Sequence, residues 1–125
     1  MAKVIKFKNN IYLYGELIER VTNEYGTYEK YSDGTLIQYG TIEFSNIDIT
    51  YTYGNLFYQL PGTLYFPMSF INTDYIVKFT LLTGGVGGCS FFGRYKNRIS
   101  TKVFSGASVT NVTVSIDWEV KGRWK

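Results

Sequence analysis

Apolar and polar residues alternate along much of the chain with the period of two that is typical of β-strands. The most regular stretch is 112–120, where every second side chain is apolar and the side chains between them are polar. Residues 73–83 alternate in the same way, and shorter stretches follow the pattern at 47–53, 64–70 and 99–103. Gly, Pro and Asn separate these stretches, as turns require. The spacing is typical of a sandwich or a barrel, and we expect an all-β fold, an antiparallel β-sandwich.

Residues 28–44 predict a β-hairpin around which the rest of the chain is organised. Asp33-Gly34 is expected to form a two-residue turn with positive φ, which Gly adopts freely and Asp tolerates. The strand after the turn is apolar on both faces, because Leu36 lies on one face and Ile37 and Tyr39 lie on the other. A strand with one solvated face would alternate more cleanly. We therefore expect Ile37 and Tyr39 to face a neighbouring subunit.

The start of the chain has a different pattern. Leu13, Leu17 and Val21 recur every four residues, which is the spacing of one face of an amphipathic helix. A strand is an equally good interpretation of so short a stretch. We expect residues 1–26 to be an N-terminal extension, either a short helix or a strand, that packs on the domain or trimerises, and residues 27–125 to be the sandwich.

Composition excludes several kinds of chemistry. The 125 residues include no His, and Cys89, beside a glycine-rich stretch expected to be a loop, is the single Cys. This removes Ser-His and Cys-His catalytic pairs, intrachain disulfides and multi-Cys zinc sites, so we expect no metal and no cofactor. Asp117 and Glu119 lie on the polar side of the last strand, where solvated carboxylates are common. We expect no enzymatic activity.

The formal net charge of +3 is spread along the chain, with basic clusters only at 94–98 and 121–125. A solvated loop and a solvated terminus explain these clusters better than a nucleic-acid groove does. No window approaches the ~20 apolar residues of a membrane span, and the N-terminus lacks the apolar core of a signal peptide. We expect neither nucleic-acid binding nor membrane insertion, and synthesis in the cytoplasm.

The hairpin sequence Lys-Tyr-Ser-Asp-Gly-Thr-Leu-Ile-Gln-Tyr-Gly-Thr at 30–41 resembles the Leu-Ser-Asn-Gly-Leu-Ile-Ile-Gln-Trp-Gly-Thr signature of bacteriophage tail-fibre C-terminal domains. Residues 64–70 and 116–122 resemble the Phe-Pro strand and the terminal Trp strand of that family, in family order. The resemblance implies a homotrimeric β-sandwich at the receptor-binding tip of a phage or prophage tail. It also implies a virion protein whose partners are a host-surface polysaccharide or other glycan and other tail proteins of the phage.

Two features depart from the family pattern. Tyr39 stands where the family usually has Trp, and the Tyr-rich stretch 47–58 has no counterpart. A weaker resemblance links Asn97-Arg98-Ile99 and Trp118 to H-type lectins, which implies a hexamer that binds N-acetylgalactosamine-type sugars. A purely structural tail or baseplate component is the third alternative.

Glycan recognition calls for aromatic rings that lie against sugar C–H bonds, together with polar groups that bind the hydroxyls. Two groups of residues meet this description, and they are our candidate ligand-binding residues: Tyr51, Tyr53 and Tyr58 in the insert, and Arg94, Tyr95, Asn97 and Arg98 in a basic loop. Loops carry recognition more often than framework strands do, so the loop is the first choice. The alternative is that the tyrosines pack between subunits.

Overall fold

A computed structural model of the protein describes residues 6–7, 11–12, 15–84 and 86–125, and all regular structure in them is β-strand. The predicted all-β fold is therefore confirmed. Nowhere in these residues is there a helix with the length and apolarity needed to cross a membrane. The strands have these bounds: β1 Lys6–Phe7, β2 Ile11–Tyr12, β3 Leu17–Asn23, β4 Gly26–Tyr31, β5 Thr35–Ile49, β6 Tyr51–Tyr53, β7 Leu56–Gln59, β8 Thr63–Tyr65, β9 Ile76–Leu81, β10 Gly88–Phe92, β11 Arg98–Ser105 and β12 Val109–Arg123.

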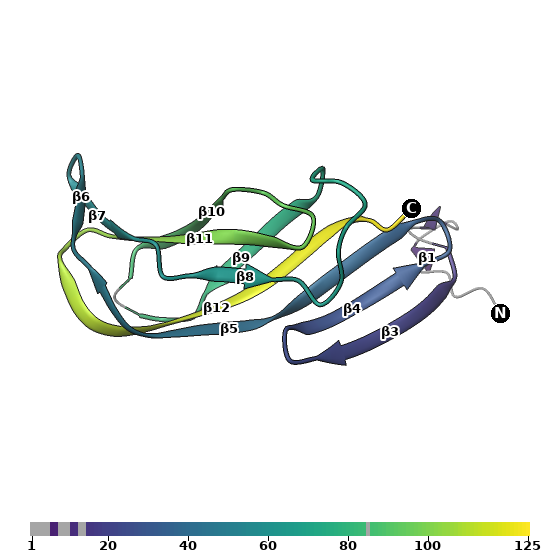
Figure 1. Cartoon of the computed structure of the whole chain (residues 1–125), viewed down its shortest axis with the longest axis horizontal. Helices are drawn as coiled ribbons and strands as arrows, with labels where there is room; N and C mark the ends of the chain where they lie inside the picture. The colour runs from purple at the N-terminus through teal and green to yellow at the C-terminus, as the bar shows by residue number, and fades with distance from the viewer. Residues whose placement is uncertain (1–5, 8–10, 13–14, 85) are drawn as a thin grey trace.

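Two five-stranded antiparallel sheets form a sandwich (Figure 1). The long sheet has the strand order β3-β4-β5-β12-β9. The short sheet has the order β10-β11-β7-β6, and β8 pairs with a further stretch of β11. β5 and β12 are 15 residues each and lie side by side along most of the molecule. They form the base on which the short sheet lies, while β1 and β2 pair only with each other.

The expected hairpin is formed by β4 and β5, but its turn differs from the prediction. Three residues, 32–34, connect the strands, and the N–H of Gly34 donates to the carbonyl of Tyr31 at 3.0 Å. Gly34 has a φ of 97°, whereas Asp33 is not among the residues with positive φ. The Asp33 carboxylate instead accepts the N–H of Thr35 at 2.9 Å. Asp33 thus stabilises the turn through its side chain, and only the glycine takes the left-handed conformation.

The helix considered for the start of the chain is wrong for residues 17–23, which form the edge strand β3. Val21 lies opposite Tyr28 of β4, and Asn23 lies opposite Gly26. Leu13 lies outside the described residues. Apolar side chains at every fourth residue were not enough to make this segment a helix. A short helix is stable only when it packs against a partner, whereas β3 gains backbone pairing along β4.

Two β-bulges bend the long strands at one end of the molecule. The pairing of β12 with β5 slips between Val109 and Val112 and again between Val112 and Val114. Asn46 and Asn111 lie at these slips with φ values of 57° and 55°, a conformation that Asn tolerates better than most residues. The bend carries the chain from β5 of the long sheet directly into β6 of the short sheet (Figure 1).

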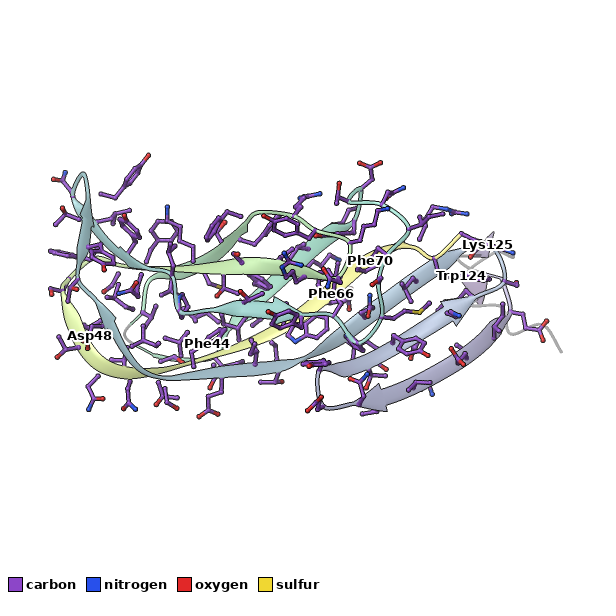
Figure 2. The ribbon with its side chains drawn as sticks, viewed as in Figure 1. Phe44, Asp48, Phe66, Phe70, Trp124 and Lys125 are labelled. Atoms are coloured by element: carbon purple, nitrogen blue, oxygen red, sulfur yellow. The ribbon has the colours of Figure 1, made fainter. Side chains whose placement is uncertain are left out.

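Asp48 lies at this bent end (Figure 2) and ties the bulges together, because its carboxylate accepts the N–H of Asn111 at 2.8 Å. Its backbone carbonyl accepts the Gln59 side-chain amide at 2.7 Å, which links β5 to β7. The corner that presents the β6–β7 hairpin is therefore held by hydrogen bonds from both sheets.

The interior of the sandwich contains the apolar residues that the alternation predicts. In β12, Val114, Ile116, Trp118 and Val120 are buried and Val112 is partly buried, and in β11 Ile99 and Val103 are fully buried. Burial of each such aliphatic side chain contributes about 1.5–3 kcal/mol. Phe66 and Phe70 also lie in this core (Figure 2), where their rings pack edge to face with centroids 5.1 Å apart.

Trp118 needs two glycines beneath its ring. A Cβ on Gly40 would lie 3.2 Å from the indole, and one on Gly26 would lie 2.9 Å from it. Gly26 also has a φ of 139°, which side-chain-bearing residues rarely adopt. The two glycines let the Trp118 side chain lie across β5 at Gly40 and reach Gly26, the first residue of β4.

Candidate functional site

The outer face of the short sheet exposes large aromatic side chains. Residues at alternate positions of its strands point away from the core, because Ile99, Thr101 and Val103 between them are buried. We call this outer surface the aromatic face, and its members are Tyr51, Tyr53, Leu56, Tyr58, Tyr65, Phe92, Arg98, Lys102 and Phe104. Contiguous exposed apolar surface on a small protein commonly marks a binding surface.

Three candidate tyrosines of the insert come together on this face. Tyr51 lies opposite Tyr58 in the β6–β7 hairpin, and their ring centroids are 5.6 Å apart. Tyr51 and Tyr53 are 57% and 66% exposed. Gly54, with a φ of 59°, makes the tight turn that projects this hairpin from the bent end of the molecule. The structure thus brings these three candidate residues together on the two strands of one hairpin.

Lys102 of β11 completes the cluster, and sequence reasoning missed it. Its ammonium lies 4.7 Å from the ring centroid of Tyr58, 5.4 Å from that of Tyr53 and 5.3 Å from that of Phe104. The outward alternation of β11 was a signal that could have found it. The sequence does not reveal that β11 pairs with β7. This pairing sets Phe104 opposite Tyr58 and so brings the neighbouring Lys102 to the tyrosines.

The basic loop divides its residues between two roles. The Arg94 side chain is used within the chain, because its guanidinium donates to the carbonyls of Thr73 at 3.1 Å and Tyr75 at 2.9 Å. It also lies over the rings of Tyr75 and Phe91, at 5.4 and 5.0 Å. The Tyr75 hydroxyl donates to the carbonyl of Tyr95 at 2.7 Å. These bonds hold the loop in one position.

Arg98 and Tyr95 are the members of the loop that are presented outward together. The Arg98 guanidinium lies 4.2 Å from the ring centroid of Tyr95 and donates to the side-chain oxygen of Asn97 at 3.0 Å. Arg98 and Lys102 lie on one side of β11, four residues and therefore about 13 Å apart along the strand. Arg98 and the three tyrosines of the insert thus lie at the two ends of one face.

Charge is divided unequally between the two sheets. From Ile49 to Ile116 the sequence has one acidic residue, Asp74, and five basic ones: Lys78, Arg94, Lys96, Arg98 and Lys102. The strands of the short sheet contain no Asp or Glu at all. The other carboxylates lie in β3, β4, β5 and β12 of the long sheet and in the segments next to them. The aromatic face is therefore cationic without a local counter-charge.

The outer face of the long sheet, which we call the polar face, contains the predicted interface residues. Ile37 and Tyr39 are both partly buried there. The Tyr39 hydroxyl donates to Glu29 at 2.9 Å, and the same carboxylate accepts Tyr31 at 2.7 Å and the Arg20 guanidinium at 2.8 Å. Within its own chain, then, Tyr39 already has a polar partner.

Burial by itself raises the pKa of the Glu29 carboxyl, but the hydrogen bonds from Tyr31, Tyr39 and Arg20 outweigh it, so the pKa lies below its ordinary value. Burial and the bond to Glu29 raise the pKa of Tyr39. Glu29 is 8% exposed and therefore acts as a buried structural carboxylate that is held ionised by its neighbours.

A shallow depression of about 450 Å³ lies on the polar face next to Tyr39, lined among others by Lys78, Asp117 and Glu119. Asp117 accepts a hydrogen bond from the Thr41 hydroxyl. The depression therefore offers a polar, charged surface next to Tyr39.

Cys89 lies in β10, not in the loop that was expected for it. Its side chain is partly buried and packs against the core residues Val103 and Val114. Burial raises the pKa of the Cys89 thiol, which keeps it protonated and therefore weakly nucleophilic.

Comparison of the chain with protein-family models, with curated proteins and with solved structures gives no match. The functional argument therefore depends on the two outer faces themselves.

Proposed function

We propose that this protein is the glycan-binding tip module of a bacteriophage or prophage tail appendage, and that it binds host-surface polysaccharide without enzymatic action. The observation that carries the proposal is the aromatic face, where the exposed Tyr53 and the half-buried Tyr58 lie against the ammonium of Lys102. The resemblance of residues 30–41 to tail-fibre tips supplies the biological setting.

Tyrosine suits this role because the face of its ring packs against sugar C–H bonds while its hydroxyl bonds to the sugar's hydroxyls. The hydroxyls of Tyr51, Tyr53 and Tyr58 take part in no hydrogen bond within the described part of the chain, so they are free to bind a ligand. Sheet positions hold the rings in fixed geometry, which lowers the entropy cost of binding.

The proposal includes assembly as a homotrimer through the part of the polar face that contains Ile37 and Tyr39. A single shallow site binds a sugar weakly, and several copies at one appendage tip multiply that affinity. Light scattering of the purified chain measures the mass directly. A trimer supports the tail-appendage function, a hexamer favours the H-type-lectin alternative, and a monomer at micromolar concentration contradicts both.

Binding is tested with fluorescently labelled protein on an array of bacterial polysaccharides and on intact bacterial cells. The matched variants are Tyr53→Thr/Tyr58→Thr on the aromatic face and Lys78→Gln on the polar face. We expect only the tyrosine variant to lose binding while it keeps the wild-type mass. A changed mass in that variant would show that the aromatic face joins subunits instead. Absence of binding to every glycan and cell would favour a purely structural tail component.

A further inference from the structure

Lys102 has an ammonium group that the protein itself does not neutralise. No carboxylate in the described residues forms an ion pair with it, and no acceptor takes a hydrogen bond from it. Its three ring contacts stabilise the positive charge but leave its N–H donors unused. A cation of this kind, on a sheet without Asp or Glu, is complementary to an anion.

The surroundings of Lys102 also fit a sugar. The ring centroids of Tyr58 and Tyr53 lie 4.7 and 5.4 Å from the ammonium, so one sugar could contact both the rings and the charge. Ser90, an exposed residue of β10, lies directly opposite Lys102 and adds a hydroxyl. The rings displace water from around the ammonium, and a charge pair is stronger where solvent is partly excluded. An anionic group bound by Lys102 would thus be attached to a ring that lies on the tyrosines.

Arg98 extends this arrangement along β11. It projects from the same side of the strand, rests on Tyr95, and likewise has no carboxylate partner among the described residues. The two residues are about 13 Å apart along the strand, which is longer than one monosaccharide. A repeating polymer with a charge on its repeat unit would reach both.

From this we infer that the aromatic face binds an anionic polysaccharide, with sugar rings on Tyr53 and Tyr58 and the acidic substituent, a carboxylate or a phosphate, on Lys102. The inference deepens the proposed function and rests on it. In this inference Lys102 is the residue that distinguishes a charged polymer from its neutral form.

The test uses two pairs of polymers that differ only in charge. Sodium polygalacturonate is compared with its fully methyl-esterified form, and a phosphomannan with the mannan left after its phosphate is removed. Affinity is measured by gel electrophoresis of the intact protein in polymer-containing gels. We expect the charged member of at least one pair to bind about tenfold more tightly, the scale of one charge-assisted hydrogen bond. The pair that responds identifies the acid as carboxylate or phosphate.

Three variants assign the effect to its residue. Lys102→Gln is expected to remove the preference for the charged polymer while it keeps binding of the neutral one, and Lys102→Arg is expected to retain the preference. Lys78→Gln lowers the formal net charge of +3 by the same amount but lies on the polar face, so it should leave the preference intact. Thermal unfolding of each variant checks that the fold is unchanged.

Several results would overturn the inference. Equal affinity of the wild-type chain for both members of each pair would do so, as would an equal loss in Lys102→Gln and Lys78→Gln. Equally tight binding of polyglutamate, which has charge but no sugar, would show a general polyanion surface. If the chain binds a neutral glycan on the array through Tyr53 and Tyr58, the proposed function stands and this inference alone fails. If it binds no glycan at all, both fail.

Discussion

The two outer faces of the sandwich cover the same core and use their polar groups in opposite ways. On the polar face, side chains bond to one another: Glu29 accepts Arg20, Tyr31 and Tyr39. On the aromatic face, the hydroxyl of Tyr53 and the ammonium of Lys102 make no hydrogen bond within the described chain.

This difference separates stability from recognition. A buried polar group that is fully paired stabilises the fold, and its loss leaves its partners unpaired. Exposed rings and unpaired donors contribute little to folding but retain their capacity to bind another molecule. We therefore expect substitutions in the hydrogen-bond network of the polar face to change the free energy of unfolding, and substitutions on the aromatic face to change binding.

The largest effect is expected where the polar face joins the core, at Gly26. Gly26→Ala would place a Cβ 2.6 Å from the carbonyl oxygen of Tyr39 and 2.9 Å from Trp118, at a φ of 139°. Strain and overpacking together should lower the free energy of unfolding by about 3 kcal/mol or more. Urea denaturation measures the loss.

Gly54→Ala, at the tip of the β6–β7 hairpin, is the matched control for that substitution. It also has a positive φ, 59°, but nothing lies within 4 Å of the added Cβ. Its cost should be about 1 kcal/mol, the backbone penalty alone. Equal losses in the two variants would contradict the packing that we assign to Trp118.

The next effect concerns the carboxylate network of the polar face. Glu29→Ala should lower the free energy of unfolding by about 2–3 kcal/mol, because it removes the carboxylate to which Tyr31, Tyr39 and Arg20 donate. Glu43→Ala removes an exposed carboxylate from the same sheet and should change it by less than about 0.5 kcal/mol. A similar value for both would mean that the network does not stabilise the fold.

Glu29 also predicts a pH dependence. Its pKa in the folded state lies below the ordinary value of 4.5, so the folded state holds the proton less tightly than the unfolded chain does. The resulting stabilisation is present above pH 4.5 and is lost as the pH falls through the folded-state pKa. Denaturation curves should show the wild-type chain losing more stability than Glu29→Gln between pH 6 and about pH 3. Parallel curves would contradict the assignment.

The smallest effect on stability is expected on the aromatic face. Tyr53→Thr keeps a residue suited to a strand and removes a ring that is 66% exposed, so the free energy of unfolding should change by less than about 0.5 kcal/mol. Binding to the glycan array should nevertheless fall. A large loss of stability in this variant would show that the two faces are not divided as we describe.

Strands whose pattern has a strict period of two were predictable from the sequence. The buried row of β12 and the pairing of β4 with β5 follow from alternation and turn chemistry. β10 was missed because the glycines that precede Cys89 indicate a loop and conceal the start of the strand. The bulges at Asn46 and Asn111 were also missed, since an extra residue in a ladder is visible only when both strands are known.

The candidate site was predictable only in part, for a similar reason. The tyrosines stood out because several occur in one short stretch. Arg98 stood out because it follows Tyr95 and Asn97 in a basic segment. Lys102 belongs to the site because β11 pairs with β7 and places it beside Tyr58, which is a contact between distant segments. Arg94 looked equivalent to Arg98, yet its hydrogen bonds to Thr73 and Tyr75 commit it to the loop.

The most direct test of the division between the two faces is backbone amide chemical-shift mapping by NMR during titration with the glycan that binds best on the array. We predict that the shifts concentrate in β6, β7 and β11, around Tyr53, Tyr58 and Lys102. Shifts centred instead on Tyr39, Asp117 and Glu119, at the depression of the polar face, would contradict the account.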